Sequence, residues 1–308
     1  MKWLRGALAI VVCLLGSQVF PADQPLITLR TEDFSAQFIQ FYNAANQPDV
    51  DEARRWALWN QYYGFATVPP GDAGRNMARE MLKQVWPQYQ KAIDRIVTGY
   101  GGMRPSPEGQ VRAVADLLEL DKPLKLVIFA YVGMFEGNAF TAENNGEVTV
   151  ALPIEDAPEH RAIAAAHELT HAVHIALGPL RGSGRPLAML ALAEGLAAHV
   201  SKALVPGGRE ERYVEFTPGW LAQARAHEAD ILNGIRPFLS ATDGETVFRF
   251  TLAKGPAGLE REAYYAGWRV VGQWLAEGHT FAQIARIPPD KAAAEFDAAI
   301  LRLLNKGH

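Results

Sequence analysis

The chain has 308 residues, of which 49% are hydrophobic, so it can bury a sizeable core in one large domain or two small ones. Its formal net charge at pH 7 is only −4, and it contains no run of Lys and Arg. This balance argues against nucleic acid or an acidic membrane surface as a partner. The composition favours a soluble globular protein.

The first 22 residues have the pattern of a secretory signal peptide. Lys2 and Arg5 form a short basic segment, and the apolar stretch 7–15 is too short to span a bilayer comfortably. The pattern predicts export to the periplasm or the medium of a bacterium, without stable membrane insertion after cleavage. An uncut N-terminal membrane anchor is the alternative. Cys13 is the only cysteine, so the cleaved chain would have no disulfide and no thiolate ligand.

Residues 23–120 are expected to form a helical N-terminal region, because apolar and aromatic residues recur there at helical spacing. The expected helices cover residues 31–45, 50–66, 72–100 and 105–120. The third of them contains Pro87, where we expect a bend. The Trp and Tyr residues of this region are expected to pack together rather than to hold a cofactor.

The pattern changes in the second region, residues 121–308. The continuous apolar and β-branched run 124–132 predicts a buried strand, and the alternating segment 147–152 predicts another. Between them, residues 133–146 are rich in Gly and Asn and are expected to form a loop. The remaining segments predict helices over residues 157–177, 187–204, 218–234, 258–277 and 289–306. We therefore expect an α+β fold that is mostly α, with a small sheet beside the first of these helices.

Residues 166–174 read A-H-E-L-T-H-A-V-H and carry two histidines four positions apart. Because four residues make little more than one helical turn, His167 and His171 point the same way and can hold one metal ion. Glu168 lies about 100 degrees round the helix axis, where it can reach a metal-bound water without ligating the metal. The alternative is a polar helix face with no metal.

The flanking residues support this helix. Asp156 is the expected N-cap, with Glu159 in the capping-box position, and Gly178 ends the helix. His160 and His174 lie near the same face, but neither has the spacing of a known third ligand. We expect His174 to lie in the core or behind the ligands.

The next predicted helix supplies a third ligand, because a catalytic zinc takes three protein ligands and leaves one position for water. Glu194 shares its face with apolar residues, where a carboxylate is costly unless it is paired or bound to a cation. A salt bridge to Arg181 or Arg185 is the alternative. Gly195 indicates close packing on a neighbouring element, for which the histidine helix is the candidate.

His167-Glu168-x-x-His171, followed by Glu194 one helix later, resembles the gluzincins, the thermolysin-like zinc metallopeptidases. The segment Asn138-Ala139-Phe140 looks like the N-A-F edge-strand segment that lines the cleft and binds the substrate backbone in such enzymes.

The A-E-G-L-A stretch around Glu194 and Y-Y-A-G-W at 264–268 also resemble a bacterial family of predicted zinc-dependent proteases of unknown substrate. The resemblance covers roughly residues 124–275. Ala198 departs from it, because thermolysin-like enzymes have an aspartate there that orients the first histidine.

The resemblance implies a zincin-like core that hydrolyses peptide bonds in a peptide or protein substrate, as an endopeptidase or an aminopeptidase. One zinc ion would be held by His167, His171 and Glu194, with Glu168 as general base. The resemblance also implies that substrate binds at Asn138 and Ala139, and that Tyr264 stabilises the oxyanion, with Tyr265 and His227 as alternates.

Two other functions stay open at this point. A binding protein could keep the fold and the metal without catalysis, although such a protein would have no need of Glu168. A zinc hydrolase could act on a substrate other than a peptide, because the zinc-water chemistry is the same.

Overall fold

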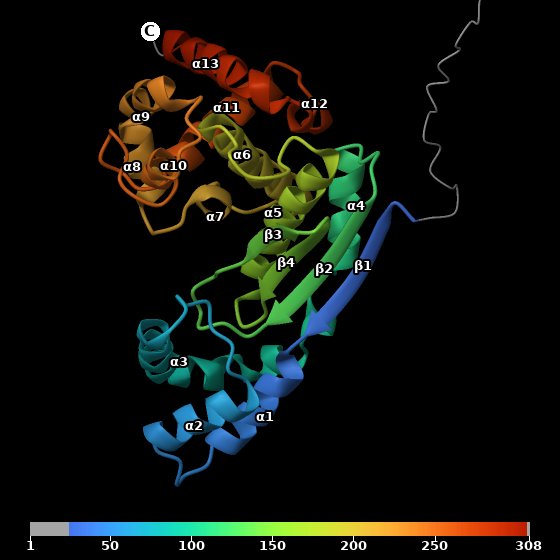
Figure 1. The fold of residues 1–308 in the computed structure, drawn as a ribbon, viewed down its shortest axis with the longest axis vertical. Helices are drawn as coiled ribbons and strands as arrows, with labels where there is room; N and C mark the ends of the chain where they lie inside the picture. The colour runs from blue at the N-terminus through green and yellow to red at the C-terminus, as the bar shows by residue number, and fades with distance from the viewer. Residues whose placement is uncertain (1–24, 307–308) are drawn as a thin grey trace, which may run out of the picture.

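The computed structural model describes residues 25–306, so the predicted signal peptide lies outside the described residues. The molecule is mostly helical, with one small sheet, as the sequence predicts. In Figure 1 the sheet lies in the middle of an elongated molecule, with one group of helices at each end. Its strands are β1 (Ile27–Asp33), β2 (Leu124–Tyr131), β3 (Phe140–Asn144) and β4 (Glu147–Pro153).

The sheet is mixed, with the strand order β1-β2-β4-β3. β1, β2 and β4 run parallel, and β3 pairs antiparallel with β4 at one edge. β3 and β4 are joined by Asn145 and Gly146, whose φ angles are 52° and 79°. Both residues thus have the positive φ that a tight two-residue hairpin turn requires, and Asn-Gly is a favoured pair for it.

Strands β1 and β3 correct two expectations. The helix predicted to begin at Thr31 begins at Ser35, because residues 27–33 pair with β2 instead. The segment 133–146, expected to be a loop, contains β3. Both are edge strands with half-exposed side chains. Because β1 comes from the first predicted region, the sheet draws strands from both sides of residue 120.

The four helices expected before residue 120 are present, each shortened at one or both ends. They are α1 (Ser35–Ala45), α2 (Glu52–Tyr62), α3 (Asp72–Val97) and α4 (Pro107–Leu117), with a short 3-10 helix η1 (Tyr100–Gly102). Pro87 lies inside α3. The aromatic residues pack together as expected: Tyr89 is buried and contacts Phe38 and Trp86, with ring centroids 4.8 and 6.3 Å away.

The second half of the chain is helical. The helices that carry or support the histidine motif are α5 (Pro158–Leu177), α6 (Leu187–Leu204) and α11 (Glu262–Ala276). The others are α7 (Glu211–Val214), α8 (Trp220–Ala226), α9 (Glu228–Ile235), η2 (Arg236–Phe238), α10 (Gly244–Thr251), α12 (Phe281–Ala285) and α13 (Pro289–Lys306). Helices α7, α10 and α12 were not predicted, and α8 and α9 were expected as one helix.

Helix α6 is long and apolar enough to cross a membrane by length and composition, and it alone passes this test among residues 25–306. Most of it is buried in the protein, where it packs against α5 and α11. Its apolar composition is therefore that of a core helix.

Candidate metal centre

Helix α5 places the histidine motif between the sheet and the C-terminal helices (Figure 1). Its N-cap is Ala157, without a side-chain cap, so the cap predicted at Asp156 is wrong. Pro158 occupies the first helical position, where its missing N–H costs nothing. Gly178 ends the helix with φ 111°, a conformation that favours glycine.

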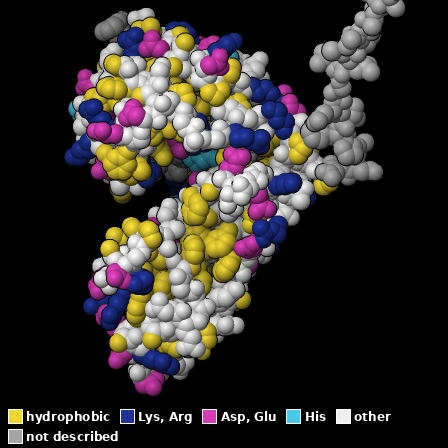
Figure 2. All heavy atoms as spheres, viewed as in Figure 1, with side chains coloured by type: hydrophobic (Ala, Val, Ile, Leu, Met, Phe, Trp, Pro, Cys, Tyr) yellow, Lys and Arg dark blue, Asp and Glu magenta, His cyan; other side chains and the backbone are white. Residues whose placement is uncertain are grey.

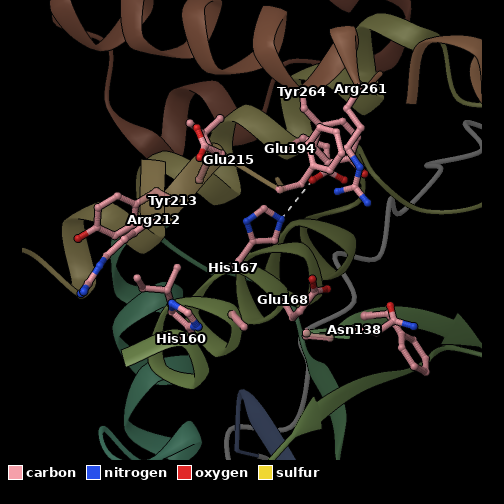
Figure 3. A pocket seen from close by; sticks show the side chains of 18 of the residues that line it. Asn138, His160, His167, Glu168, Glu194, Arg212, Tyr213, Glu215, Arg261 and Tyr264 are labelled. Atoms are coloured by element: carbon pink, nitrogen blue, oxygen red, sulfur yellow. Dashed lines mark hydrogen bonds and ion pairs between the residues drawn. The ribbon is translucent and has the colours of Figure 1, made fainter. Parts of the chain in front are cut away.

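Three side chains from α5 and α6 meet at one point. His167 Nε2 lies 3.1 Å from His171 Nε2. It also lies 3.1 Å from Glu194 Oε2, a contact drawn as a dashed line in Figure 3. His171 Nε2 lies 3.6 Å from Glu194 Oε1. Ligand atoms about 2.0–2.1 Å from a tetrahedral zinc ion are about 3.3 Å apart, so these three separations suit such an ion.

Glu168 also lies near this point, because its carboxylate and the two imidazoles bring their ligand atoms within 4.8 Å of one another. Both histidines, however, direct Nε2 at Glu194. The Glu168 carboxylate is instead held by Thr141 on β3. We therefore assign Glu194, and not Glu168, as the third candidate ligand.

The charges of the cluster are mutually dependent. Burial alone would raise the pKa of Glu194. The charges and hydrogen bonds of His171 and His167 have a larger, opposite effect and hold this pKa well below its usual range. Burial likewise opposes a charge on His171, but Glu194 outweighs it and the net pKa of His171 is raised. Glu194 is thus an anion that faces two imidazole nitrogens, a donor set that suits zinc.

The salt bridges considered for Glu194 are absent from residues 25–306. Arg181 pairs with Glu143, at 3.3 Å. Arg185 donates to the carbonyl oxygen of Leu180 instead.

The close packing that Gly195 indicates involves α11 and not the histidine helix. A Cβ at Gly195 would lie 2.2 Å from the carbonyl oxygen of Gly267, and a Cβ at Gly267 would lie 1.9 Å from that of Ala191. The backbones of α6 and α11 can approach this closely because glycine, which has no Cβ, stands at the contact on both helices. The contact holds Glu194, on α6, beside Tyr264, on α11.

Glu168 is positioned by the edge strand. The Thr141 hydroxyl lies 2.7 Å from Glu168 Oε2 and 2.9 Å from the backbone carbonyl oxygen of Glu168, so it can donate to either. Because Thr141 lies on β3, this contact ties the carboxylate to the sheet. Glu168 therefore has a hydrogen-bond partner on the sheet beside the imidazoles.

The two tyrosines considered for oxyanion stabilisation point to different places. Tyr264 lines the same cleft as His167 and Glu194, and burial, with the charge of Glu194, raises its pKa (Figure 3). Tyr265 is buried and donates to Glu228, away from the cleft. His227 is not among the residues that line the cleft, and it contacts Asp230. Only Tyr264 is placed to act at the candidate centre.

The candidate centre lies in an open cleft of about 940 Å³. Figure 2 shows the surface hollowed between the two halves of the molecule, with histidine side chains visible at the base. One wall contains Asn138, Ala139 and Thr141, from β3 and the segment before it. The opposite wall is formed by residues 211–218 together with Arg261 and Tyr264.

The remaining histidines of the motif region have other surroundings. His174 is fully buried, and burial lowers its pKa to about 3, so it is neutral at pH 7 and part of the core. His160 lines the cleft at a distance from the ligands (Figure 3). His199 stacks on Trp268, with ring centroids 3.8 Å apart.

No family model, curated protein or solved structure matches the chain. The architecture is thus an α+β, mostly helical protein with a candidate three-ligand centre. Its function has to be inferred from the centre itself.

Thr141 and Arg261 line the cleft but were not predicted from the sequence. Thr141 follows the Asn138-Ala139-Phe140 segment directly, and the Asn145-Gly146 pair could have revealed the hairpin that places it. Arg261 carries no comparable sequence pattern, because the aromatic rings that hold it come from separate segments.

Proposed function

We propose that the protein is an exported zinc-dependent metallopeptidase. The observation that carries the proposal is the convergence of His167, His171 and Glu194 at 3.1–3.6 Å, with Glu168 beside them. Zinc bound there would supply a Lewis acid and lower the pKa of a bound water to near neutral. His167, His171 and Glu194 all line the cleft, which would give water access to the ion.

The chain's own residues supply the proton transfers. Glu168 takes the proton of the attacking water as general base and later delivers it to the leaving amine. The Thr141 hydroxyl limits the rotation of the Glu168 carboxylate, so its proton acceptor stays aligned. The Tyr264 phenol, whose pKa is raised, is protonated at neutral pH and can donate a hydrogen bond to the developing oxyanion.

The edge of the sheet suits an extended peptide. β3 is paired only with β4, so its outer edge carries backbone groups that can pair with another strand. Asn138 and Ala139, which precede β3, line the cleft beside the candidate centre. A peptide bound along this edge would place one of its carbonyl groups near Glu168.

Hydrolysis of a peptide library by the zinc-loaded protein, with Glu168→Gln as control, tests this function. We expect the wild type to cleave peptides and the variant to lose about a hundredfold or more in kcat while it keeps its zinc. Zinc without turnover on any peptide would contradict the proposal and favour a binding protein. Turnover confined to other esters or amides would favour a different zinc hydrolase.

A further inference from the structure

Arg261 lies on the wall of the cleft, held by two aromatic rings. Its guanidinium carbon is 4.6 Å from the ring centroid of Phe216 and 5.2 Å from that of Tyr264, and all three residues line the cleft. Aromatic stacking occupies the faces of a guanidinium and leaves the N–H donors in its plane free. Those donors match the two oxygens of a carboxylate.

No carboxylate of the described residues forms an ion pair with Arg261, although nearby arginines have such partners. Arg225 pairs with Glu210, and Arg269 with Glu228. On the same wall, the Glu215 carboxylate accepts from two backbone N–H groups at the start of α8 and is thereby satisfied. Arg261 is therefore a half-buried cation without an internal counter-ion at a candidate active site.

The backbone fixes Arg261 relative to the candidate centre. It has φ 59° and directly precedes α11, where its carbonyl oxygen accepts from the Tyr264 N–H at 3.0 Å. The Gly195–Gly267 contact holds this end of α11 against α6. In Figure 3 the guanidinium of Arg261 lies on the same side of the cleft as Tyr264 and Glu194. An anion bound to it would lie close to the point where the ligands meet.

We propose that Arg261 binds a carboxylate of the substrate and makes the cleft selective for peptides that carry one close to the cleaved bond. The inference rests on the proposed function and names its substrate class. Two groups have the required chemistry, the free C-terminus of a peptide and an Asp or Glu side chain. The first would make the enzyme act near chain ends, and the second would make it an acid-selective endopeptidase.

Arg212 offers a matched control. It also lines the cleft and also lacks an ion pair among residues 25–306, but it is exposed and lies beside Tyr213 and His160 (Figure 3). Replacing Arg212 or Arg261 removes the same charge from the same cleft. Only Arg261 should determine the response to the substrate carboxylate.

The test measures binding in the Glu168→Gln background, so it requires no turnover. Fluorescently labelled peptides of one sequence are compared as the free acid, the C-terminal amide, and the amide with one internal Glu. We expect the free acid, or the Glu-containing amide, to bind about ten- to a hundredfold more tightly than the plain amide. The form that gains affinity identifies the source of the carboxylate.

The variants decide whether Arg261 is responsible. Arg261→Gln should bind all three forms equally, Arg261→Lys should recover part of the preference, and Arg212→Gln should keep it. Circular dichroism checks that each variant is folded. Three results would overturn the proposal. The first is a preference for the carboxylate that survives in Arg261→Gln. The others are no preference, or no binding of any peptide form, in the protein that keeps Arg261. If an Arg261-dependent preference appears in a protein without zinc or hydrolysis, the proposed function alone fails.

Discussion

Glu194 is a carboxylate on the apolar face of α6, and it faces two imidazole nitrogens instead of a permanent cation. The two arginines considered as its partners, Arg181 and Arg185, make other contacts. A buried charge with only titratable partners is costly, and a bound cation would remove that cost. The position of Glu194 on the apolar face of α6 is therefore consistent with its proposed role as a zinc ligand.

Thr141 gives a prediction for the general base. Thr141→Val should lower kcat by about tenfold with zinc content and KM nearly unchanged, because a removed hydrogen bond misaligns Glu168 without touching a ligand. Steady-state kinetics measures kcat and KM separately. Thr141→Ser, which keeps the hydroxyl, should recover most of the rate. An unchanged kcat in Thr141→Val would show that Glu168 needs no support from β3.

Tyr264 gives a prediction for oxyanion stabilisation. Tyr264→Phe should lower kcat by about a hundredfold, because one donor to the transition state is lost. Tyr265→Phe is the matched control: it removes the bond to Glu228 and should lower the melting temperature with little effect on kcat. Equal effects of the two substitutions on kcat would contradict the role given to Tyr264.

At the scale of elements, the crossing of α6 and α11 sets the positions of Glu194 and Tyr264. Gly267→Ala should destabilise the fold by about 1–3 kcal/mol, because the new Cβ would lie 1.9 Å from a backbone oxygen that cannot rotate away. We also expect weaker zinc binding, since Glu194 would shift. Denaturant unfolding and metal titration measure both effects.

Gly244→Ala, in α10, is the control for this change, because a Cβ there would meet nothing within 4 Å. It should leave stability unchanged or slightly raised and zinc binding intact. A Gly267→Ala protein as stable as this control would show that the two helices can separate without cost.

The longer helices were predictable because their apolar periodicity extends over several turns, whereas α7, α10 and α12 are too short to show it. β1 and β3 were missed because each is half-exposed, so its pattern is weak beside the helical pattern of α1 or the Gly and Asn of the loop. Local sequence also misplaced the N-cap of α5, where Pro158 at the first position takes the place of a side-chain cap.

The candidate ligands were predictable because they depend on spacing within helices. His167 and His171 follow from helical geometry, and Glu194 follows from its apolar neighbours. The site of Arg261 was not predictable from the sequence. It depends on Phe216, which lies 45 positions earlier, and on the fold that brings both residues to one wall of the cleft. The contact of Gly195 with Gly267 was likewise not predictable, because it depends on how α6 packs on α11.

At the scale of the whole molecule, the cleft depends on a loop held by a buried carboxylate. Glu155 accepts from the N–H of Gly133 at 2.9 Å and of Phe135 at 3.3 Å, at the start of the segment that leads to Asn138. Burial raises the pKa of Glu155 from 4.5 to about 8. Protonation of Glu155 is therefore coupled to folding in this region.

The sign of this coupling gives a pH prediction. Between about pH 4.5 and 8 the folded protein keeps a proton on Glu155 that the unfolded chain has lost, so the free energy of unfolding falls as pH rises. The contribution of one group is at most about 1.4 kcal/mol per pH unit. Glu155→Gln should remove this contribution to the slope, and denaturant unfolding of the zinc-free proteins across this range measures it. Identical slopes for the two proteins would contradict the prediction.

The zinc content of the purified protein tests the central claim most directly. Mass spectrometry and elemental analysis of the wild type should find one zinc ion per chain after loading at neutral pH, with a sharp loss in Glu194→Ala. Glu211→Ala, which removes a carboxylate from the same cleft, should keep the metal. A wild type that holds no zinc, or a Glu194→Ala protein that holds it as firmly, would contradict the three-ligand centre.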